Sequence, residues 1–176
     1  MKRNTVVMRL VAAALFSAMI MILTLLNVRV PGTTTGAYIH AGDSLIYTCS
    51  WFIGGFYSAS AAALGSFLAD LYLGAADYMF ATLVIKFIMG LVCALMLRML
   101  GDRPWAVIVS AGAGAFIMIS GYGAYEWFMF GKAAAFGNMP ANLIQGVAGI
   151  VIVLPIITAL KNVKALDVYR KMNKDR

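Results

Sequence analysis

The sequence predicts an all-α integral membrane protein, a single compact bundle of six transmembrane helices with both termini cytoplasmic. Three observations predict this class. Hydrophobic residues make up 62% of the 176 and charged residues 12%, with a mean hydropathy of +0.87, which is more apolar surface than a water-soluble domain can bury. No connection between apolar segments exceeds about 15 residues, so little length is left for a domain outside the membrane. The basic residues gather at the chain ends and in one loop.

Six apolar segments form the predicted bundle, and the whole chain, 1–176, is one domain. The first segment is longer than the apolar core of a signal peptide and no small-x-small cleavage pattern follows it, so it is predicted to be a helix. The two cysteines lie inside apolar segments and are interpreted as small core residues. The predicted helices cover residues 6–27, 41–56, 58–73, 78–100, 105–130 and 141–160, followed by a basic cytoplasmic tail at 161–176.

The connections carry residues that stop helices. In the loop 28–39, Pro31, Gly32 and three consecutive threonines exclude a continuing helix. Gly54-Gly55 predicts a tight turn between two short or tilted helices. Residues 131–140, which contain glycines and a proline, are predicted to be a loop between the fifth and sixth helices.

The lysines and arginines set the predicted orientation. With both termini inside, 11 of the 14 fall on the cytoplasmic side, which leaves Arg29 and Lys132 outside and Lys86 embedded. The net charge of +7 is therefore interpreted as a topology signal, and no nucleic-acid partner is predicted. This orientation places the loops 31–40, 74–77 and 131–140 together on the outer face.

Two helices carry rows of small residues. Ala14 and Ala18 lie one turn apart in the first helix. The third helix has two parallel rows, one of Ser58, Ala62, Ser66 and Asp70 and one of Ala61, Gly65 and Ala69. Such rows allow close helix packing inside a bundle, or they form a face that docks another membrane protein. The sequence leaves both readings open.

Four ionisable side chains interrupt the apolar segments, all in the outer half of the predicted bundle: Asp43, Asp70, Lys86 and Glu126. Each costs roughly 2.5–3.5 kcal/mol at mid-bilayer unless it has a partner or a function. Structural readings exist for all of them. Asp43 suits a helix N-cap, Asp70 and Lys86 suit an ion bridge between adjacent helices, and Glu126 beside Trp127 suits the membrane interface.

Further polar residues are predicted to lie at the same depth, in the outer half of the bundle. His40 lies in the polar stretch 36–43 and, taken by itself, suits an ordinary loop position. Asn138, Asn142 and Gln145 form one row of the sixth helix, which is expected to face inward. Aromatic walls are expected from Tyr38, Tyr78, Tyr122 and Trp127. Together these residues predict an outward-opening pocket for a small polar heterocycle. The predicted substrate-binding residues are Tyr38, His40, Asp43, Lys86, Tyr122, Glu126, Asn142 and Gln145.

No P-loop, metal cluster or nucleophile-base pair is visible, so no cofactor, metal or enzymatic activity is predicted. The whole-chain plan resembles the substrate-binding S component of an energy-coupling factor (ECF) transporter. The resemblance covers the chain to about residue 90. It rests on the Ala14 and Ala18 pair, on 39–43 (Ile-His-Ala-Gly-Asp), on Gly54-Gly55, on Gly65-Ser66 with Asp70, and on Thr82, Ile85-Lys86 and Gly90.

This resemblance implies a multi-pass protein of the prokaryotic cell membrane that captures a vitamin from outside. Its implied partners are a transmembrane scaffold subunit and two ATPase subunits, which supply the energy. In the family the face equivalent to Ala14 and Ala18 docks on the scaffold. Substrate is held by the first outer loop and helices four to six, which implicates His40, Lys86, Glu126, Asn142 and Gln145.

Within the family, the 40–43 stretch and Lys86 look most like the branch associated with vitamin B6 forms and hydroxymethylpyrimidine, which is also labelled riboflavin-type. A ring nitrogen would bond to Asp43 or Glu126, and a phenolic oxygen to Lys86. Riboflavin or another vitamin is the alternative substrate. Two readings from other classes stay open: a structural or assembly subunit without ligand, and a stand-alone secondary transporter or intramembrane enzyme.

Overall fold

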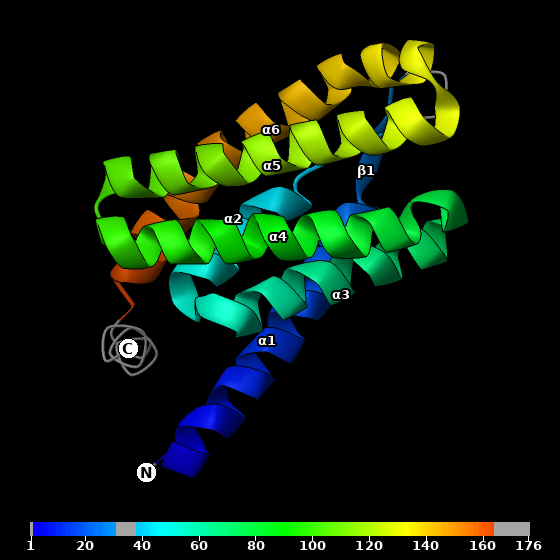
Figure 1. Ribbon diagram of the computed structural model, residues 1–176. Helices are drawn as coiled ribbons and strands as arrows, with labels where there is room; N and C mark the ends of the chain where they lie inside the picture. Colours follow the sequence, from blue (N-terminus) through cyan, green and yellow to red (C-terminus); the bar gives the residue numbers. More distant parts are fainter. Residues whose placement is uncertain (1, 31–37, 164–176) are drawn as a thin grey trace.

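The computed structural model describes residues 2–30 and 38–163, so most of the predicted tail at 161–176 lies outside the described residues. The described chain forms six helices and one two-stranded hairpin (Figure 1). The helices are α1 (Lys2–Leu25), α2 (Gly42–Phe52), α3 (Gly55–Leu73), α4 (Ala76–Leu100), α5 (Pro104–Phe130) and α6 (Lys132–Lys161), and the strands are β1 (Asn27–Arg29) and β2 (Tyr38–His40).

The prediction of a six-helix, all-helical membrane bundle is confirmed. Four helices, α1, α4, α5 and α6, are long and apolar enough to cross a membrane. In contrast, α2 has 11 residues and rises only about 16 Å, roughly half of a ~30 Å hydrocarbon layer. It ends at Phe52 instead of near residue 56, and it lies within the bundle without spanning it.

Every residue of α2 is buried, because α1, α3, α4 and α6 all pack against it. The hydroxyl groups of its serine and threonine residues bond to backbone carbonyls, whereas the buried Tyr47 hydroxyl has no partner among the described residues. Thr48 Oγ1 donates to Ser44 O at 2.7 Å, and Ser50 Oγ donates to Ile46 O at 2.9 Å and across to Gly90 O of α4 at 3.1 Å. These bonds let a short helix with several polar side chains occupy the apolar core.

Two glycine turns join neighbouring helices closely. Gly54 and Gly55, both with positive φ, make the tight turn predicted between α2 and α3. Gly131, at φ 86°, alone separates α5 from α6, so the predicted loop at 131–140 is wrong. Pro140 lies inside α6 instead. A proline is tolerated there because neighbouring helices in a membrane protein can satisfy the backbone groups it leaves without partners.

The predicted irregular loop at 28–39 is also corrected in its described parts. β1 and β2 pair antiparallel, with Asn27 opposite His40, Val28 opposite Ile39 and Arg29 opposite Tyr38. Residues 31–37 lie outside the described part of the chain. Figure 1 shows this hairpin beside the end of the bundle where α5 turns into α6, away from both chain ends.

The small-residue rows of α3 lie in helix contacts. A Cβ at Gly65 would lie 2.5 Å from Ser17 O of α1, and a Cβ on Gly90 of α4 would lie 3.3 Å from Ala62 Cβ. The α3 rows therefore pack α1 and α4 closely against α3, which is the bundle-packing reading. Ala14 and Ala18 differ, since both lie on the exposed side of α1.

Candidate functional site

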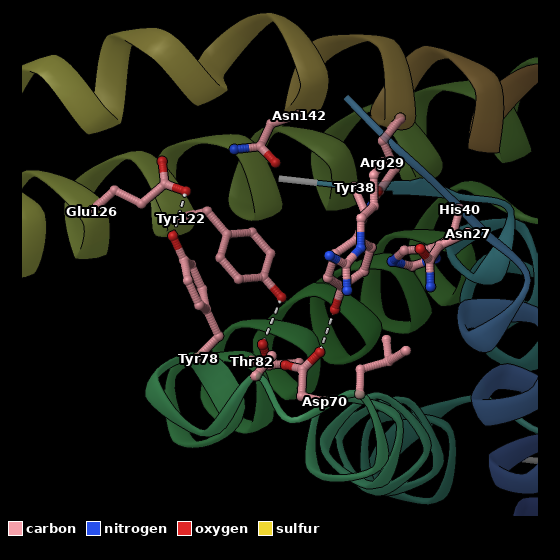
Figure 2. A pocket seen from close by; sticks show the side chains of 13 residues that line it. Asn27, Arg29, Tyr38, His40, Asp70, Tyr78, Thr82, Tyr122, Glu126 and Asn142 are labelled. Carbon is pink, nitrogen blue, oxygen red and sulfur yellow. Dashed lines mark hydrogen bonds between the residues drawn. The ribbon is translucent and has the colours of Figure 1, made fainter. Parts of the chain in front are cut away.

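A cavity of about 210 Å³ lies at the end of the bundle where the hairpin meets the α3–α4 turn (Figure 2). Helices α4, α5 and α6 supply the opposite walls. The lining is mostly polar and aromatic: Asn27, Arg29, Tyr38, His40, Asp70, Leu73, Ala75, Tyr78, Thr82, Tyr122, Glu126, Asn142 and Gln145.

The hairpin contributes one face to the cavity. Successive side chains of a strand point to opposite sides, so Asn27 and Arg29 share a face with their partners His40 and Tyr38. All four line the cavity, whereas Val28, between the first two, is 72% exposed. Two three-residue strands thus supply four of the eleven polar residues in the lining.

His40 is neutral and its ring orientation is fixed. Nδ1 accepts a hydrogen bond from the Gly42 backbone N–H at 3.0 Å and lies 3.5 Å from Thr24 Oγ1. A Cβ at Gly42 would lie 2.8 Å from this nitrogen, so a glycine is needed there. Burial lowers the pKa of His40 to about 4, with Lys86 also lowering it and Asp43 opposing. Because Nδ1 accepts, the ring proton is on Nε2.

On the α3 side of the cavity, a chain of hydroxyl groups ends on a carboxylate. Tyr38 Oη donates to Asp70 Oδ1 at 2.5 Å, and Tyr122 Oη donates to Thr82 Oγ1 at 3.0 Å. Thr82 in turn bonds to Asp70. Figure 2 shows both tyrosine hydroxyls directed down to this pair. Burial, and next the Asp70 carboxylate, raise the pKa of Tyr38, so its phenol stays protonated and acts as the donor.

Glu126 of α5 forms the second acidic group of the lining and is only 3% exposed. Its Oε1 accepts from Tyr78 Oη at 3.2 Å and from Asn138 Nδ2 at 2.8 Å. Its Oε2 is buried and has no hydrogen-bond partner among the residues that the structure describes. Burying a carboxylate oxygen without a hydrogen-bond donor is energetically unfavourable.

Beneath the cavity, Lys86 Nζ lies 2.5 Å from Asp43 Oδ1, with the two side chains 1% and 0% exposed. Gln145 Nε2 donates to Asp43 Oδ2 at 2.9 Å and connects this pair to the lining. The suggested ion bridge between Asp70 and Lys86 is therefore wrong, since Lys86 pairs with Asp43 of α2 instead. The capping reading of Asp43 is wrong as well, because α2 has no side-chain cap bond.

Comparison with known protein families identifies the family of this chain. Residues 4–162 match the model of the family described as "ECF-type riboflavin transporter, S component". The chain belongs to this family. It is an S component, a transport subunit and not an enzyme, and S components are multi-pass proteins of the prokaryotic plasma membrane that work with an ECF energising module.

Two further proteins are similar to this S component. A solved structure described as "Structure and mechanism of the S component of a bacterial ECF transporter" superimposes with a TM-score of 0.71 at 16% identity, over 88% of this chain and 95% of that one. It supports the fold alone. An uncharacterized protein of Pyrococcus woesei, from a gap 3′ region, is 26% identical over 130 residues, which is 73% of this chain and 86% of the relative.

The structure brings the eight predicted site residues of this S component to one region but divides them into two groups. Six line the cavity, and Asp43 and Lys86 lie below it as the ion pair. The expected aromatic wall from Trp127 is wrong, because this residue is 43% exposed and is not part of the lining. Its ring packs edge-on against Phe136, and Lys132 Nζ lies 5.0 Å from the ring centroid.

Sequence reasoning left Asn27, Arg29, Leu73 and Ala75 out of the site. A three-residue strand gives too short an alternation to detect, so the hairpin residues had no signal beyond their polarity between two apolar segments. Tyr78 lies in the lining, as expected for one of the aromatic walls. Asp70 and Thr82 also line the cavity, although they were not among the predicted substrate-binding residues. Within 2–30 and 38–163, no three His, Cys, Asp or Glu side chains gather as metal ligands would.

Proposed function

We propose that this S component captures a small single-ring vitamin or vitamin precursor at the outer face, with a B6 form or hydroxymethylpyrimidine favoured, and delivers it across the membrane with an ECF scaffold subunit and two ATPase subunits. The observation that carries the proposal is the cavity, which is small and polar. With both termini cytoplasmic, this cavity opens outward. Its proposed ligand contacts come from Tyr38, His40, Tyr122, Glu126, Asn142 and Gln145.

The size of the cavity argues for one ring. Pockets for drug-sized molecules have volumes of about 300–1,000 Å³, and this one has about 210 Å³. A single aromatic ring with short polar substituents suits that space and can lie against Tyr38 or Tyr122. Riboflavin, with three fused rings and a sugar-alcohol chain, is the second candidate. It is kept because the matched family is described as a riboflavin transporter component.

We propose that the scaffold subunit docks on the side of α1 that faces away from the bundle. Ala14 and Ala18 are exposed there, beside Leu15 at 61% and Leu10 at 54% exposure. Small side chains one turn apart let another helix approach the backbone closely. Because α1 packs mainly on α3 and leaves this side uncovered, a partner helix has access to it.

The proposed capture is tested by equilibrium binding of a vitamin panel to the purified full chain, with Asn142→Ala as the site variant. Among the residues that the structure describes, none forms a hydrogen bond with the Asn142 side chain. Its loss should therefore weaken ligand binding without disturbing the fold. Ser120→Ala, on the exposed side of α5, is the control. We expect about tenfold weaker binding for Asn142→Ala only. A panel in which no vitamin binds would favour the structural-subunit reading.

A further inference from the structure

The carboxyl group of Glu126 joins α5 to both of the helices that pack against it. Asn138 Nδ2 of α6 donates to Glu126 Oε1 at 2.8 Å, and Tyr78 Oη of α4 donates to the same oxygen at 3.2 Å. Glu126 is 3% exposed and Asn138 is 0% exposed. The two donors therefore meet on one carboxyl oxygen inside the protein.

The second oxygen of this carboxyl group, Oε2, is in a different environment. Figure 2 shows it turned away from Tyr78. It is buried and has no hydrogen-bond donor among the residues that the structure describes, so neither bulk water nor a molecule in the cavity reaches it. An ionised carboxylate would spread its negative charge onto this oxygen, where nothing stabilises it.

No cation compensates for such a charge. In residues 2–30 and 38–163 the ion pair joins Lys86 to Asp43, and Lys132 at the start of α6 lies over the Trp127 ring. A buried charge without a counter-ion is neutralised by a proton. Of the titratable residues that share the lining with Glu126, only Tyr78 bonds to it; the others are Arg29, Tyr38, His40, Asp70 and Tyr122.

The Asn138 amide suits a protonated carboxyl group. Its NH₂ group donates to Glu126 Oε1, and its oxygen Oδ1 is buried, as Oε2 is. A carboxylate oxygen and an amide oxygen are both acceptors, so they cannot bond to each other. A proton on Oε2 makes it an O–H donor, and a carboxylic acid and a primary amide then fit together through two parallel hydrogen bonds.

We propose that Glu126 is a neutral carboxylic acid at neutral pH, and that its Oε2–H donates to the amide oxygen of Asn138. The inference goes beyond the proposed function and does not depend on which vitamin binds. With Glu126 neutral, the charged groups of the lining are the Arg29 guanidinium and the Asp70 carboxylate. The cavity then presents no net formal charge to its ligand.

Glu126 is the only glutamate of the chain, so its protonation can be measured directly. The full chain, labelled with ¹³C at the side-chain carboxyl carbon of glutamate, is placed in lipid nanodiscs without ligand. Its NMR signal distinguishes an acid from a carboxylate. We expect the acid signal from about pH 5 to about pH 7. A carboxylate signal at pH 7 would overturn the inference, including the case in which a buried water is the donor to Oε2.

The same spectra test the role of Asn138. The acid proton of Glu126 should show a contact with the Asn138 amide group. An acid signal without that contact would overturn the assignment of Asn138 as the acceptor.

Unfolding gives an independent measurement. The unfolded chain releases the Glu126 proton above about pH 4.3, whereas the folded chain keeps it. Relative to Glu126→Gln, which mimics the neutral acid, the folding constant of the wild type should therefore fall about tenfold for each pH unit between about 5 and 7. The control is Asp102→Asn, in the turn between α4 and α5 and outside the lining, for which the ratio should stay constant. A constant ratio for Glu126→Gln would contradict the inference.

Discussion

The ammonium group of Lys86 and the carboxylate of Asp43 form an ion pair at 2.5 Å in which neither side chain reaches solvent. The pair joins α4 to α2 directly below the cavity, and Gln145 of α6 completes it by donating to the second Asp43 oxygen. Three helices are thereby held in register by one polar cluster. Its charges neutralise each other, so it shapes the cavity floor without contributing net charge.

Removing one member of this pair should be costly. Lys86→Met leaves the buried Asp43 carboxylate without its cation, and the expected loss is about 3–5 kcal/mol of unfolding free energy. The double variant Lys86→Met with Asp43→Asn removes both charges and should recover most of that loss. Reversible unfolding in mixed micelles measures both. A double variant as unstable as the sum of the two single variants would contradict the account.

Stability should depend on pH through His40. Its folded pKa of about 4 is below the ordinary 6.5, so the unfolded chain binds an extra proton between these values. Stability from the neutral ring is complete above about pH 6.5 and is lost as pH falls toward about 4, by roughly 3 kcal/mol. Of the charged groups near the ring, Asp43 raises its pKa and Lys86 lowers it.

Thermal unfolding of the wild type and of His40→Gln across pH 4–7 measures the effect. The wild-type midpoint should fall more steeply than that of the variant as pH decreases. Parallel curves would show that His40 is not the group responsible. The ring's own titration, followed by NMR, should show no protonation above about pH 5.

The contact between α1 and α3 depends on the absence of one Cβ. In Gly65→Ala the new carbon would lie 2.5 Å from Ser17 O, which is backbone and cannot move aside alone. We expect a loss of about 1–3 kcal/mol in unfolding free energy. The control is Gly112→Ala in α5, where a Cβ meets nothing within 4 Å and helix propensity favours alanine. Equal effects of the two substitutions would refute the close contact.

The proposed docking face predicts a separation of binding from assembly. Ala14→Trp and Ala18→Trp place bulk on the exposed side of α1, so copurification of the ECF subunits should be lost while ligand affinity stays within about threefold of wild type. Val151→Trp on α6, at 63% exposure, is the control for a large side chain facing lipid. If both tryptophan variants still assemble with the ECF subunits, this face of α1 is not the docking face.

Much of the fold could be predicted from the sequence because membrane helices are long apolar runs. The six segments and the Gly54-Gly55 turn follow from that pattern. The start of α6 could not be predicted, since Pro140 and nearby glycines normally end helices in water, and a membrane bundle tolerates them. The hairpin was missed because strands of three residues have no measurable period.

For the site, the shared depth of the polar residues correctly indicated where they converge, but their partners depend on helix rotation. Lys86 could reach either Asp43 or Asp70 from its sequence position alone. In the structure Lys86 points toward Asp43 of α2, and Asp70 of α3 accepts a hydrogen bond from Tyr38 of the hairpin instead. Pairing of this kind is decided by packing angles that no spacing rule encodes.

The most direct test of the central claim is native mass spectrometry of the full chain extracted gently from its own membranes, with the released ligand identified by its mass. The account predicts a small single-ring vitamin or vitamin precursor, bound one to one. Release of a flavin, or an empty protein that binds none of the single-ring vitamins, would contradict it.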